Sequence, residues 1–491
     1  MNSRPNILIF VMDTQPVRNL TPYGYGRPTT PNLERIVGEG LVYDNHFVTS
    51  SWTVPVHASL FTGLYQTGHG TGGQYEFLSP SLPTMAGWLR TAGYQTIGFS
   101  NNTWVNQDET NIARGFETFY LVPRPSGQNP QIGPEDDFVL HDEVDSGSAQ
   151  TVDLVRHWFK DTYDAERPYF LFINCVEPHL RAWAAEPFRG QFLLEGTTDA
   201  EARAVNQDIF AERLGRVPGR TDGYMSPQDW EILKSLYDGE TACLDQRIGV
   251  LFDHLNERGL LDNTLLIILS DHGDLLERQG MMGHHLSLFD DLIHTPLIVR
   301  WPGVVPAGGR FGGFVQISDW LPTFLDILGA QGPSLDIELQ GVSLAPTWQG
   351  QQVRDFIVAE YMKPIQTIER ALRHDPDLDY RIWLRYLKTI RNHEHKYIWA
   401  SDGRDMLFDL LADSGERINL IQDKPEVAIG LRQQLEEFLL TLKRRDFGDA
   451  MRNHGFRNVR WQNVDRLKAW GIYREIEEEK EDASITPGKS S

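Results

Sequence analysis

The sequence is short of cysteine and contains no long apolar run. Cys175 and Cys243 are its only cysteines, so at most one disulfide can form, and an oxidising compartment is not implied. The apolar run from Ile7 to Met12 is too short for the core of a signal peptide or for a membrane span, and no later run is long enough to cross a bilayer. We therefore expect a cytoplasmic protein with no membrane partner.

Positive charge is also scarce. The 491 residues include 46 lysines and arginines against 68 aspartates and glutamates, which gives a formal net charge of -22. A chain with this charge repels nucleic acids and anionic membranes, so we expect neither as a partner, although a local basic pocket is compatible with it. The length suits one large α/β domain with a smaller one, or up to three domains. The C-terminal arm, residues 457–473, is compatible with a homo-oligomer, but nothing in the sequence requires one.

Two continuous apolar runs end in side chains that can bind metals. Residues 6–12 lead to Asp13, and residues 264–270 lead to Asp271 and His272. Such runs predict strands that are buried on both faces of a parallel sheet. Open α/β folds bind ligands at the carboxyl edge of the sheet, so these side chains are either metal ligands or strand-end caps. A carboxylate and an imidazole together suit manganese or zinc better than calcium, which prefers oxygen ligands.

Two further predicted strands end in polar loops. The run 168–174 precedes His179, and the run 93–100 precedes Asn101. A histidine in such a loop is either a buried structural residue or a group that faces the ligand, and an asparagine there is often a turn former. The residue types alone leave these alternatives open.

The stretch from Ser50 to Gly63 holds a threonine between an extended run and a predicted helix. Thr53 lies just before the helix, where free backbone N–H groups and the positive end of the helix dipole attract an anion. Serine and threonine at this position are usually helix caps. Its function therefore depends on which other groups lie beside it.

Besides the strand that ends in Asp13, motifs occur in six later parts of the chain: Tyr23-Gly24-Tyr25 with Thr30-Pro31-Asn32-Leu33; Thr53-Val54-Pro55-Val56-His57 with Leu60 and Thr62-Gly63; Glu177-Pro178-His179; Ser270-Asp271-His272-Gly273; Pro296–Arg300; and Leu407–Leu410 with Asp413, Glu416 and Asn419-Leu420. Together these motifs resemble the sulfatase branch of the alkaline phosphatase superfamily over most of the chain, from Asn6 to about Gly471.

The resemblance implies an α/β fold of the alkaline phosphatase type, with a large, mostly parallel central sheet flanked by helices and a smaller C-terminal α/β subdomain. We expect a catalytic domain over residues 1–385, with insertions at about 185–225 and 362–387. A subdomain of short antiparallel strands and one helix is expected over 386–475. The charged tail, 476–491, is expected to be disordered.

The chain departs from the family pattern at the nucleophile. Sulfatases carry a cysteine or serine in place of Thr53, and that residue is oxidised to formylglycine. Threonine cannot undergo this conversion, so we expect no formylglycine. His57 replaces an arginine, Asp13-Thr14 replaces a pair of aspartates, and Asn101 replaces a lysine. No second metal site is evident, and we expect one divalent ion.

The resemblance also implies roles for individual residues. The expected metal ligands are Asp13, Thr53, Asp271 and His272. The expected catalytic residues are Thr53, His179 and His285, and the expected substrate-binding residues are His57, Asn101, His179 and His285. The roles of His284 and His285 are not separated by the sequence.

We expect the protein to hydrolyse a small anionic ester. A divalent cation lowers the pKa of a bound hydroxyl, so Thr53 is predicted to attack phosphorus and form a covalent phospho-threonine. Phosphate diesters or phosphonate esters are the first prediction for the substrate. Sulfate ester hydrolysis is the alternative, because the fold and the surrounding motifs are of the sulfatase type. A phosphoryl transferase and a non-catalytic anion-binding protein are the remaining alternatives.

Overall fold

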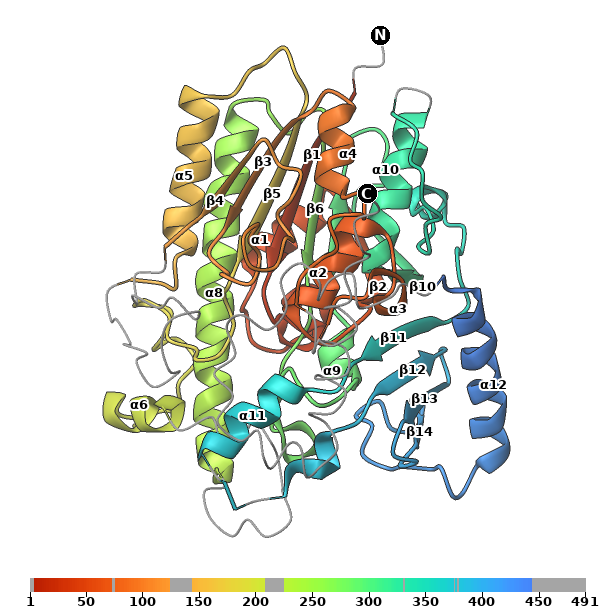
Figure 1. Cartoon of the computed structure of the whole chain (residues 1–491). Helices are drawn as coiled ribbons and strands as arrows, with labels where there is room; N and C mark the ends of the chain where they lie inside the picture. The colour runs from red at the N-terminus through yellow and green to blue at the C-terminus, as the bar shows by residue number, and fades with distance from the viewer. Residues whose placement is uncertain are drawn as a thin grey trace, which may run out of the picture.

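The computed structural model describes residues 4–72, 76–123, 144–207, 225–329, 332–374, 376–377 and 379–443 (Figure 1). Its main feature is an eight-stranded sheet with the order β10-β2-β9-β6-β1-β5-β3-β4. Every neighbouring pair in it is parallel except the two pairs that include β9. The strands are β1 Asn6–Met12, β2 Leu41–Phe47, β3 Gln95–Ser100, β4 Thr118–Leu121, β5 Tyr169–Cys175, β6 Thr264–Ser270, β9 Leu297–Arg300 and β10 Gly309–Gln316. The predicted α/β fold with a large, mostly parallel sheet is confirmed.

The central strands are mostly apolar because helices cover both faces of the sheet. In β1, Ile7 and Ile9 belong to the core on one face, whereas Leu8 and Phe10 belong to the core on the other. Successive side chains of a strand point to opposite faces, so every position is buried when both faces of the sheet are covered, and apolar residues are favoured throughout. This is the physical reason why these strands could be recognised from the sequence.

The helices form one layer on each face of the sheet (Figure 1). The first layer contains α2, α4 and α10, and the second contains α1, α5 and α8. The bounds are α1 Pro31–Val37, α2 Thr53–Thr62, α4 Met85–Thr91, α5 Ser148–Asp161, α8 Pro227–Glu257 and α10 Trp320–Leu328. Within the described residues, no helix combines the length and the apolar character that a membrane crossing requires.

Several predicted boundaries change in the structure. The helix predicted over 316–330 is instead the end of β10, a 3-10 turn over Ile317–Asp319 and then α10, because Asp319 and Gln316 cap the turn reciprocally. The predicted insertion at 185–225 holds α6 Asp199–Gln207, and the one at 362–387 holds α11 Ile365–His374 and a 3-10 turn over Tyr380–Trp383. Other short elements include α3 Gln66–His69, α9 Asp290–Ile293 and the hairpin of β7 Leu275–Leu276 with β8 Met282–Gly283.

A second, antiparallel sheet forms the C-terminal part of the described chain. Its strands are β11 Ile357–Tyr361, β12 Leu387–Arg391, β13 His395–Ala400 and β14 Met406–Asp409, and α12 Pro425–Thr441 packs on it through a shared apolar core. The predicted small α/β unit is therefore present. Its first strand lies upstream of residue 386, so the sheet starts earlier than the subdomain predicted over 386–475. The predicted tail, 476–491, lies outside the described residues.

A buried cluster of charges joins α9 to the small sheet. Lys396, on β13, has a fully buried side chain, and its ammonium lies 2.8 Å from Asp290 Oδ1 and 2.7 Å from Glu416 Oε1. Arg391 donates to Asp290 Oδ2 at 3.0 Å. Burial raises the pKa of Asp290, but the charges of Lys396 and Arg391 outweigh it and hold that pKa well below its usual range. Because Asp290 begins α9, this cluster fixes the segment after His285 to the small sheet.

Lys396→Met is expected to destabilise the protein by about 3–5 kcal/mol, because it leaves two buried carboxylates without their shared cation. The pKa of Asp290 is depressed in the folded protein, so its contribution is present above the unfolded pKa of about 4 and is lost as the pH falls through the folded pKa. Denaturant unfolding at neutral pH measures the effect. Lys424→Met, at an exposed ion pair of 2.8 Å with Asp409, is the control and is expected to cost less than about 1 kcal/mol. Equal losses in the two variants would contradict this prediction.

Candidate active site

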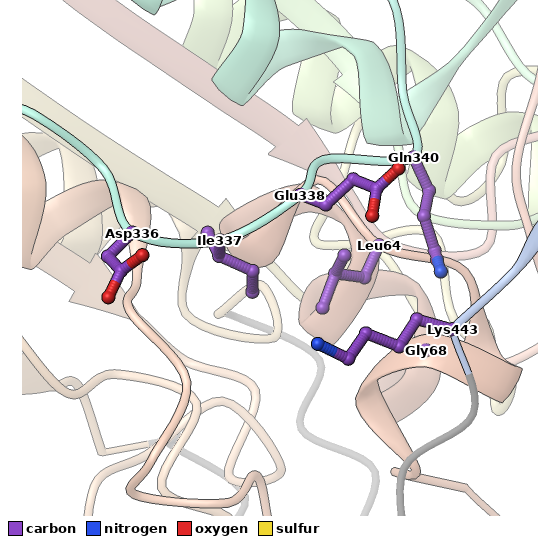
Figure 2. A pocket seen from close by; sticks show the side chains of 7 residues that line it. All are labelled: Leu64, Gly68, Asp336, Ile337, Glu338, Gln340 and Lys443. Carbon is purple, nitrogen blue, oxygen red and sulfur yellow. The ribbon is translucent and has the colours of Figure 1, made fainter.

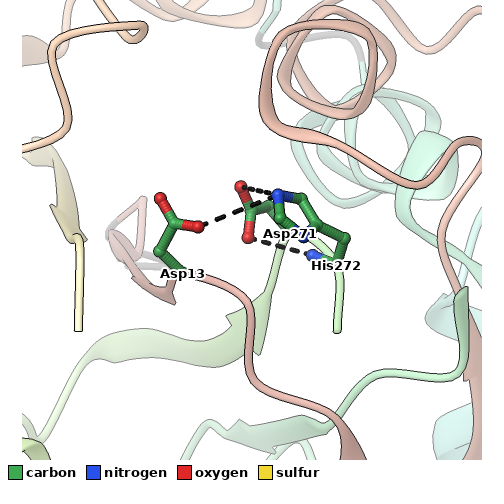
Figure 3. Close-up of side chains that lie close together, drawn as sticks. All are labelled: Asp13, Asp271 and His272. Carbon is green, nitrogen blue, oxygen red and sulfur yellow. Dashed lines mark hydrogen bonds and ion pairs between the residues drawn. The ribbon is translucent and has the colours of Figure 1, made fainter. Parts of the chain in front are cut away.

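Three potential metal ligands meet at the carboxyl edge of the large sheet. Asp13 follows β1, and Asp271 and His272 follow β6, the strand hydrogen-bonded beside it, with Met12 paired to Ser270. One ligand atom from each of the three side chains lies within 4.8 Å of those of the other two (Figure 3). Strand pairing therefore brings together residues that are far apart in the sequence, as the sequence predicted.

The geometry of His272 leaves one ring nitrogen available to a cation. Its Nδ1 lies 3.0 Å from the carbonyl oxygen of Gly273, which can only accept, so Nδ1 carries the proton and Nε2 keeps its lone pair. Nε2 lies 3.5 Å from Asp271 Oδ2 and 3.8 Å from Asp13 Oδ1 (Figure 3). Among the described residues, Asp271 Oδ2 accepts no hydrogen bond. Two carboxylates and a neutral imidazole form a donor set that fits a divalent cation.

The electrostatics of the cluster agree with this fit. Asp13, Asp271 and His272 are all buried. Burial raises the pKa of Asp271 to about 7, although the backbone N–H groups of Thr14 and His272 lower it. Burial lowers the pKa of His272, although Asp13 raises it. The imidazole is therefore neutral at pH 7 and cannot balance the carboxylates, which a divalent cation can do.

Thr53 lies beside these ligands. It is the first residue of α2, and its Oγ1 lies 3.3 Å from His272 Nε2. Trp52, rather than Thr53, occupies the cap position before the helix, so the threonine is one residue further into the helix than predicted. The hydroxyl thus lies at the positive end of the helix dipole and next to the candidate metal ligands. The sequence-predicted set of Asp13, Thr53, Asp271 and His272 is assembled in one place.

His57 contacts the backbone of Thr53 from within the buried core. Its Nδ1 donates to the Thr53 carbonyl oxygen at 2.9 Å, and its ring contacts Phe61 and Phe172. It is fully buried, and burial lowers its pKa to about 4, so the ring is neutral at pH 7. This placement argues against the predicted contact with substrate and gives His57 a positioning role.

Asn101, which the sequence predicts to bind substrate, contacts the loop after β5. Its side chain accepts from the N–H of Val176 at 2.6 Å and donates to Glu177 Oε2 at 3.3 Å, so it orders the loop after β5. The next residue, Asn102, donates to Asp13 Oδ2 instead. The chain leaves the alternating pleat of β3 at this point, so the sequence could not show which asparagine faces Asp13. The adjacent pair of asparagines was the only sequence feature that pointed to Asn102.

Three further histidines form a chain of ring contacts that begins at the candidate ligand His272. The ring centroid of His284 lies 4.5 Å from that of His272, 4.5 Å from that of His285 and 5.0 Å from that of His179. His284 follows the β7–β8 hairpin, which folds the chain back toward β6. Sequence reasoning predicted His179 and His285 but gave His284 no role, although the adjacent histidine pair was visible. His179 and His285 are partly exposed, so they lie between the buried ligands and solvent.

A small cavity of about 60 Å³ lies away from the candidate metal ligands (Figure 2). Its lining includes Leu64 and Gly68, which follow α2, together with Asp336, Glu338 and Lys443. Thr53 begins α2 and Leu64 comes after its end, so the cavity is at the opposite end of a ten-residue helix. None of the predicted site residues lines it, and we assign it no function.

Comparisons with known proteins show which families and proteins this chain is similar to. The sulfatase family model matches residues 5–330, and the model for the C-terminal region of N-sulphoglucosamine sulphohydrolase matches residues 284–445. An N-acetylglucosamine-6-O-sulfatase of Bacteroides thetaiotaomicron is 24% identical over 88% of this chain and 86% of its own length. A multifunctional alkaline phosphatase superfamily protein of Trinickia caryophylli is 26% identical over 87% of this chain and 93% of its own length.

A solved structure supports the fold. The phosphonate monoester hydrolase of Agrobacterium radiobacter superposes with a TM-score of 0.70 and 23% identity, covering 89% of this chain and 96% of its own. At that level of identity the likeness concerns the fold, and it agrees with the eight-stranded sheet and the C-terminal sheet described above.

Proposed function

The chain belongs to the sulfatase family, in the alkaline phosphatase superfamily of metal-dependent ester hydrolases. From this premise we propose that it hydrolyses phosphate diesters or phosphonate esters with Thr53 as the nucleophile. The observation that carries the proposal is the distance of 3.3 Å between Thr53 Oγ1 and His272 Nε2, within a cluster that fits a divalent cation. An unmodified hydroxyl in this position suits attack on phosphorus.

The metal centre would be held by Asp13, Asp271 and His272, with the Thr53 hydroxyl beside them. When bound, a divalent cation supplies two things: it lowers the pKa of a hydroxyl that coordinates it, and it neutralises charge on the ester oxygens. We propose manganese or zinc rather than calcium, because an imidazole is among the ligands.

The protein side chains would carry the remaining chemistry. The hydrogen bond from His272 Nδ1 to the Gly273 carbonyl keeps the proton on Nδ1 and orients the ring so that Nε2 faces the candidate ligands. His57 holds the Thr53 carbonyl and so fixes the first turn of α2. In the proposed attack, the Thr53 hydroxyl gives up its proton to solvent and Oγ1 bonds to phosphorus as the bond to the leaving oxygen breaks. His179, His284 and His285 are the nearby groups able to protonate that oxygen. Water then displaces Thr53 from phosphorus, with one histidine as base.

Sulfate ester hydrolysis is the second candidate, because the family model and several relatives bear sulfatase names. The aldehyde hydrate of formylglycine allows a sulfated adduct to eliminate, whereas a sulfated threonine has no such route and must be hydrolysed directly. This difference is the reason for our preference for phosphorus. A phosphoryl transferase would use the same intermediate with an alcohol in place of water.

A substrate panel with one leaving group tests the proposal. The purified protein, after elemental analysis, would be assayed with 4-nitrophenyl esters of an alkyl phosphate diester, a phosphonate and sulfate. We expect about one divalent ion per chain and a kcat/KM for the better phosphorus ester at least about tenfold above that for sulfate. A higher value for sulfate would favour the second candidate. A protein without a divalent ion and without turnover of any ester would favour a non-catalytic anion-binding role.

A further inference from the structure

Two N–H donors lie close together in the segment between α11 and β12, within the predicted insertion at 362–387. The side chain of Arg385 is 10% exposed, and Trp383 packs, partly buried, against the apolar core of the large sheet. The guanidinium carbon of Arg385 lies over the Trp383 ring, 5.8 Å from its centroid. We call Arg385 and Trp383 the donor pair.

Neither member of the donor pair has its hydrogen-bonding capacity filled by the described part of the chain. Arg385 Nε and Trp383 Nε1 are both shielded from solvent, and no described residue accepts a hydrogen bond from either atom. A buried donor without an acceptor is costly, so native proteins satisfy nearly all such groups with a protein atom, a water molecule or an ion. Two such donors side by side point to a ligand that accepts hydrogen bonds.

The charge around Arg385 selects the sign of that ligand. Among the described residues, the nearest carboxylate oxygen is Asp402 Oδ1, which lies 3.8 Å from Arg385 Nη1, beyond hydrogen-bond distance. Asp402 is already paired with Arg404, whose Nε donates to Asp402 Oδ2 at 2.8 Å. Two guanidinium groups therefore share one carboxylate, and one positive charge is not balanced. Burial lowers the pKa of Arg385, Asp402 raises it and Arg404 lowers it.

Strand pairing brings the donor pair toward the histidines at the edge of the large sheet. Leu387, two residues after Arg385, pairs with Tyr361 at the end of β11. Burial raises the pKa of the Tyr361 hydroxyl, and the backbone of Leu286 lowers it, so that hydroxyl lies at the residue that follows His285. The donor pair shares no residue with the cluster of candidate metal ligands.

We propose that the donor pair binds an oxyanion, namely a sulfate, phosphate or carboxylate group, at a site separate from the metal cluster. This site goes beyond the proposed function and does not depend on it. A guanidinium presents two parallel N–H groups that match two oxygens of such an anion, and the indole N–H donates to the same group. The anion balances the charge of Arg385 and gives both buried donors an acceptor. A free ion and a second anionic group on a substrate offer the same chemistry.

Calorimetric titration with sodium sulfate tests the site in the Asp271→Asn protein, which is expected to hold no metal that attracts an anion. Sodium chloride at equal ionic strength is the reference titration. We expect one sulfate per chain. Adding Arg385→Gln is expected to raise the Kd for sulfate at least about tenfold, and adding Trp383→Phe, which removes the N–H and keeps a ring, about threefold. Absence of sulfate binding to the Asp271→Asn protein, or an unchanged Kd in both double variants, would overturn the proposal.

Arg300→Gln is the matched control for the removal of a buried arginine. Arg300 is 7% exposed, close to the 9% of Arg385, but its guanidinium has acceptors. Its Nε donates to Glu39 Oε2 at 2.9 Å, and its Nη1 donates to the Leu261 carbonyl at 3.1 Å. In the same Asp271→Asn background, we expect Arg300→Gln to leave the Kd for sulfate unchanged. Equal losses of affinity in Arg300→Gln and Arg385→Gln would contradict a site at the donor pair.

A pair of esters identifies the source of the anion. Wild type and Arg385→Gln would be assayed with two esters of one phosphorus acid, whose leaving alcohols have equal pKa and differ by a distal sulfonate. A loss of kcat/KM confined to the sulfonated ester supports the site as one for a second anionic group of the substrate. Equal kcat/KM values in the two proteins support it as a site for a free ion. A protein that hydrolyses no ester, yet binds sulfate in an Arg385-dependent way, would refute the proposed reaction and support the site.

Discussion

Thr53→Ala is expected to abolish ester hydrolysis, with a loss of at least about 10³-fold in kcat, while the fold and the metal content persist. The substitution removes the one hydroxyl that lies 3.3 Å from His272 Nε2 and leaves the three other candidate ligands in place. A covalent route has no substitute for its nucleophile, so the loss concerns the chemical step rather than substrate affinity. The measurement is kcat for the best ester of the panel, together with elemental analysis and thermal unfolding of the same preparation.

Thr53→Ser is the matched control, because it keeps the hydroxyl and removes only the methyl group. We expect it to retain activity within about tenfold of the wild type. Mass spectrometry of acid-quenched wild type is expected to find phosphate on Thr53 during turnover and none in the alanine variant. Turnover by Thr53→Ala at more than a tenth of the wild-type rate would remove Thr53 from the mechanism.

Asp271→Asn is expected to lose the divalent ion and, with it, activity by at least about 10³-fold. The amide has the same shape as the carboxylate but lacks the charge that attracts a cation. Burial raises the pKa of Asp271 to about 7, so the ionised form is disfavoured in the metal-free protein and favoured by a bound cation. Addition of manganese or zinc is therefore expected to raise the melting temperature of the wild type but not that of Asp271→Asn. Metal content and thermal shift both report the loss without any assay of turnover.

Asp238→Asn is the control for replacing a buried carboxylate. Asp238 is fully buried and accepts hydrogen bonds from Tyr25, Asn19 and Arg27, but it is not part of the metal cluster. We expect its replacement to lower the melting temperature and to leave the metal content unchanged. If Asp271→Asn retained a full complement of metal, Asp271 could not be a ligand.

The clustering of Asp13, Asp271 and His272 was predictable because it depends on strands that could be recognised from local sequence. Each of the runs before Asp13 and Asp271 is buried on both faces of the sheet, so it appears as unbroken apolar sequence, and the first polar residue after it marks the carboxyl edge. The small sheet was harder to delimit. β11 lies far upstream of β12 in the sequence, and only their pairing assigns it to the C-terminal sheet.

Residues in loops were less predictable, because side-chain direction there does not follow the two-residue period of a strand. Asn101 and Asn102 are chemically identical neighbours, yet one orders the loop after β5 and the other contacts Asp13. The same applies to His284 and His285 after the β7–β8 hairpin. Lys396 was also missed, since its partners Asp290 and Glu416 lie in other parts of the sequence.

The sequence by itself determined the chemistry open to the candidate nucleophile: Thr53 carries a hydroxyl that cannot become formylglycine, and this is a property of one side chain. The tertiary structure alone decided which groups lie beside that hydroxyl. Thr53 and His272 lie far apart in the chain, yet the Thr53 hydroxyl lies 3.3 Å from His272 Nε2 because the start of α2 meets the end of β6. Contacts of this kind depend on the packing of whole elements, which no local pattern of residues encodes.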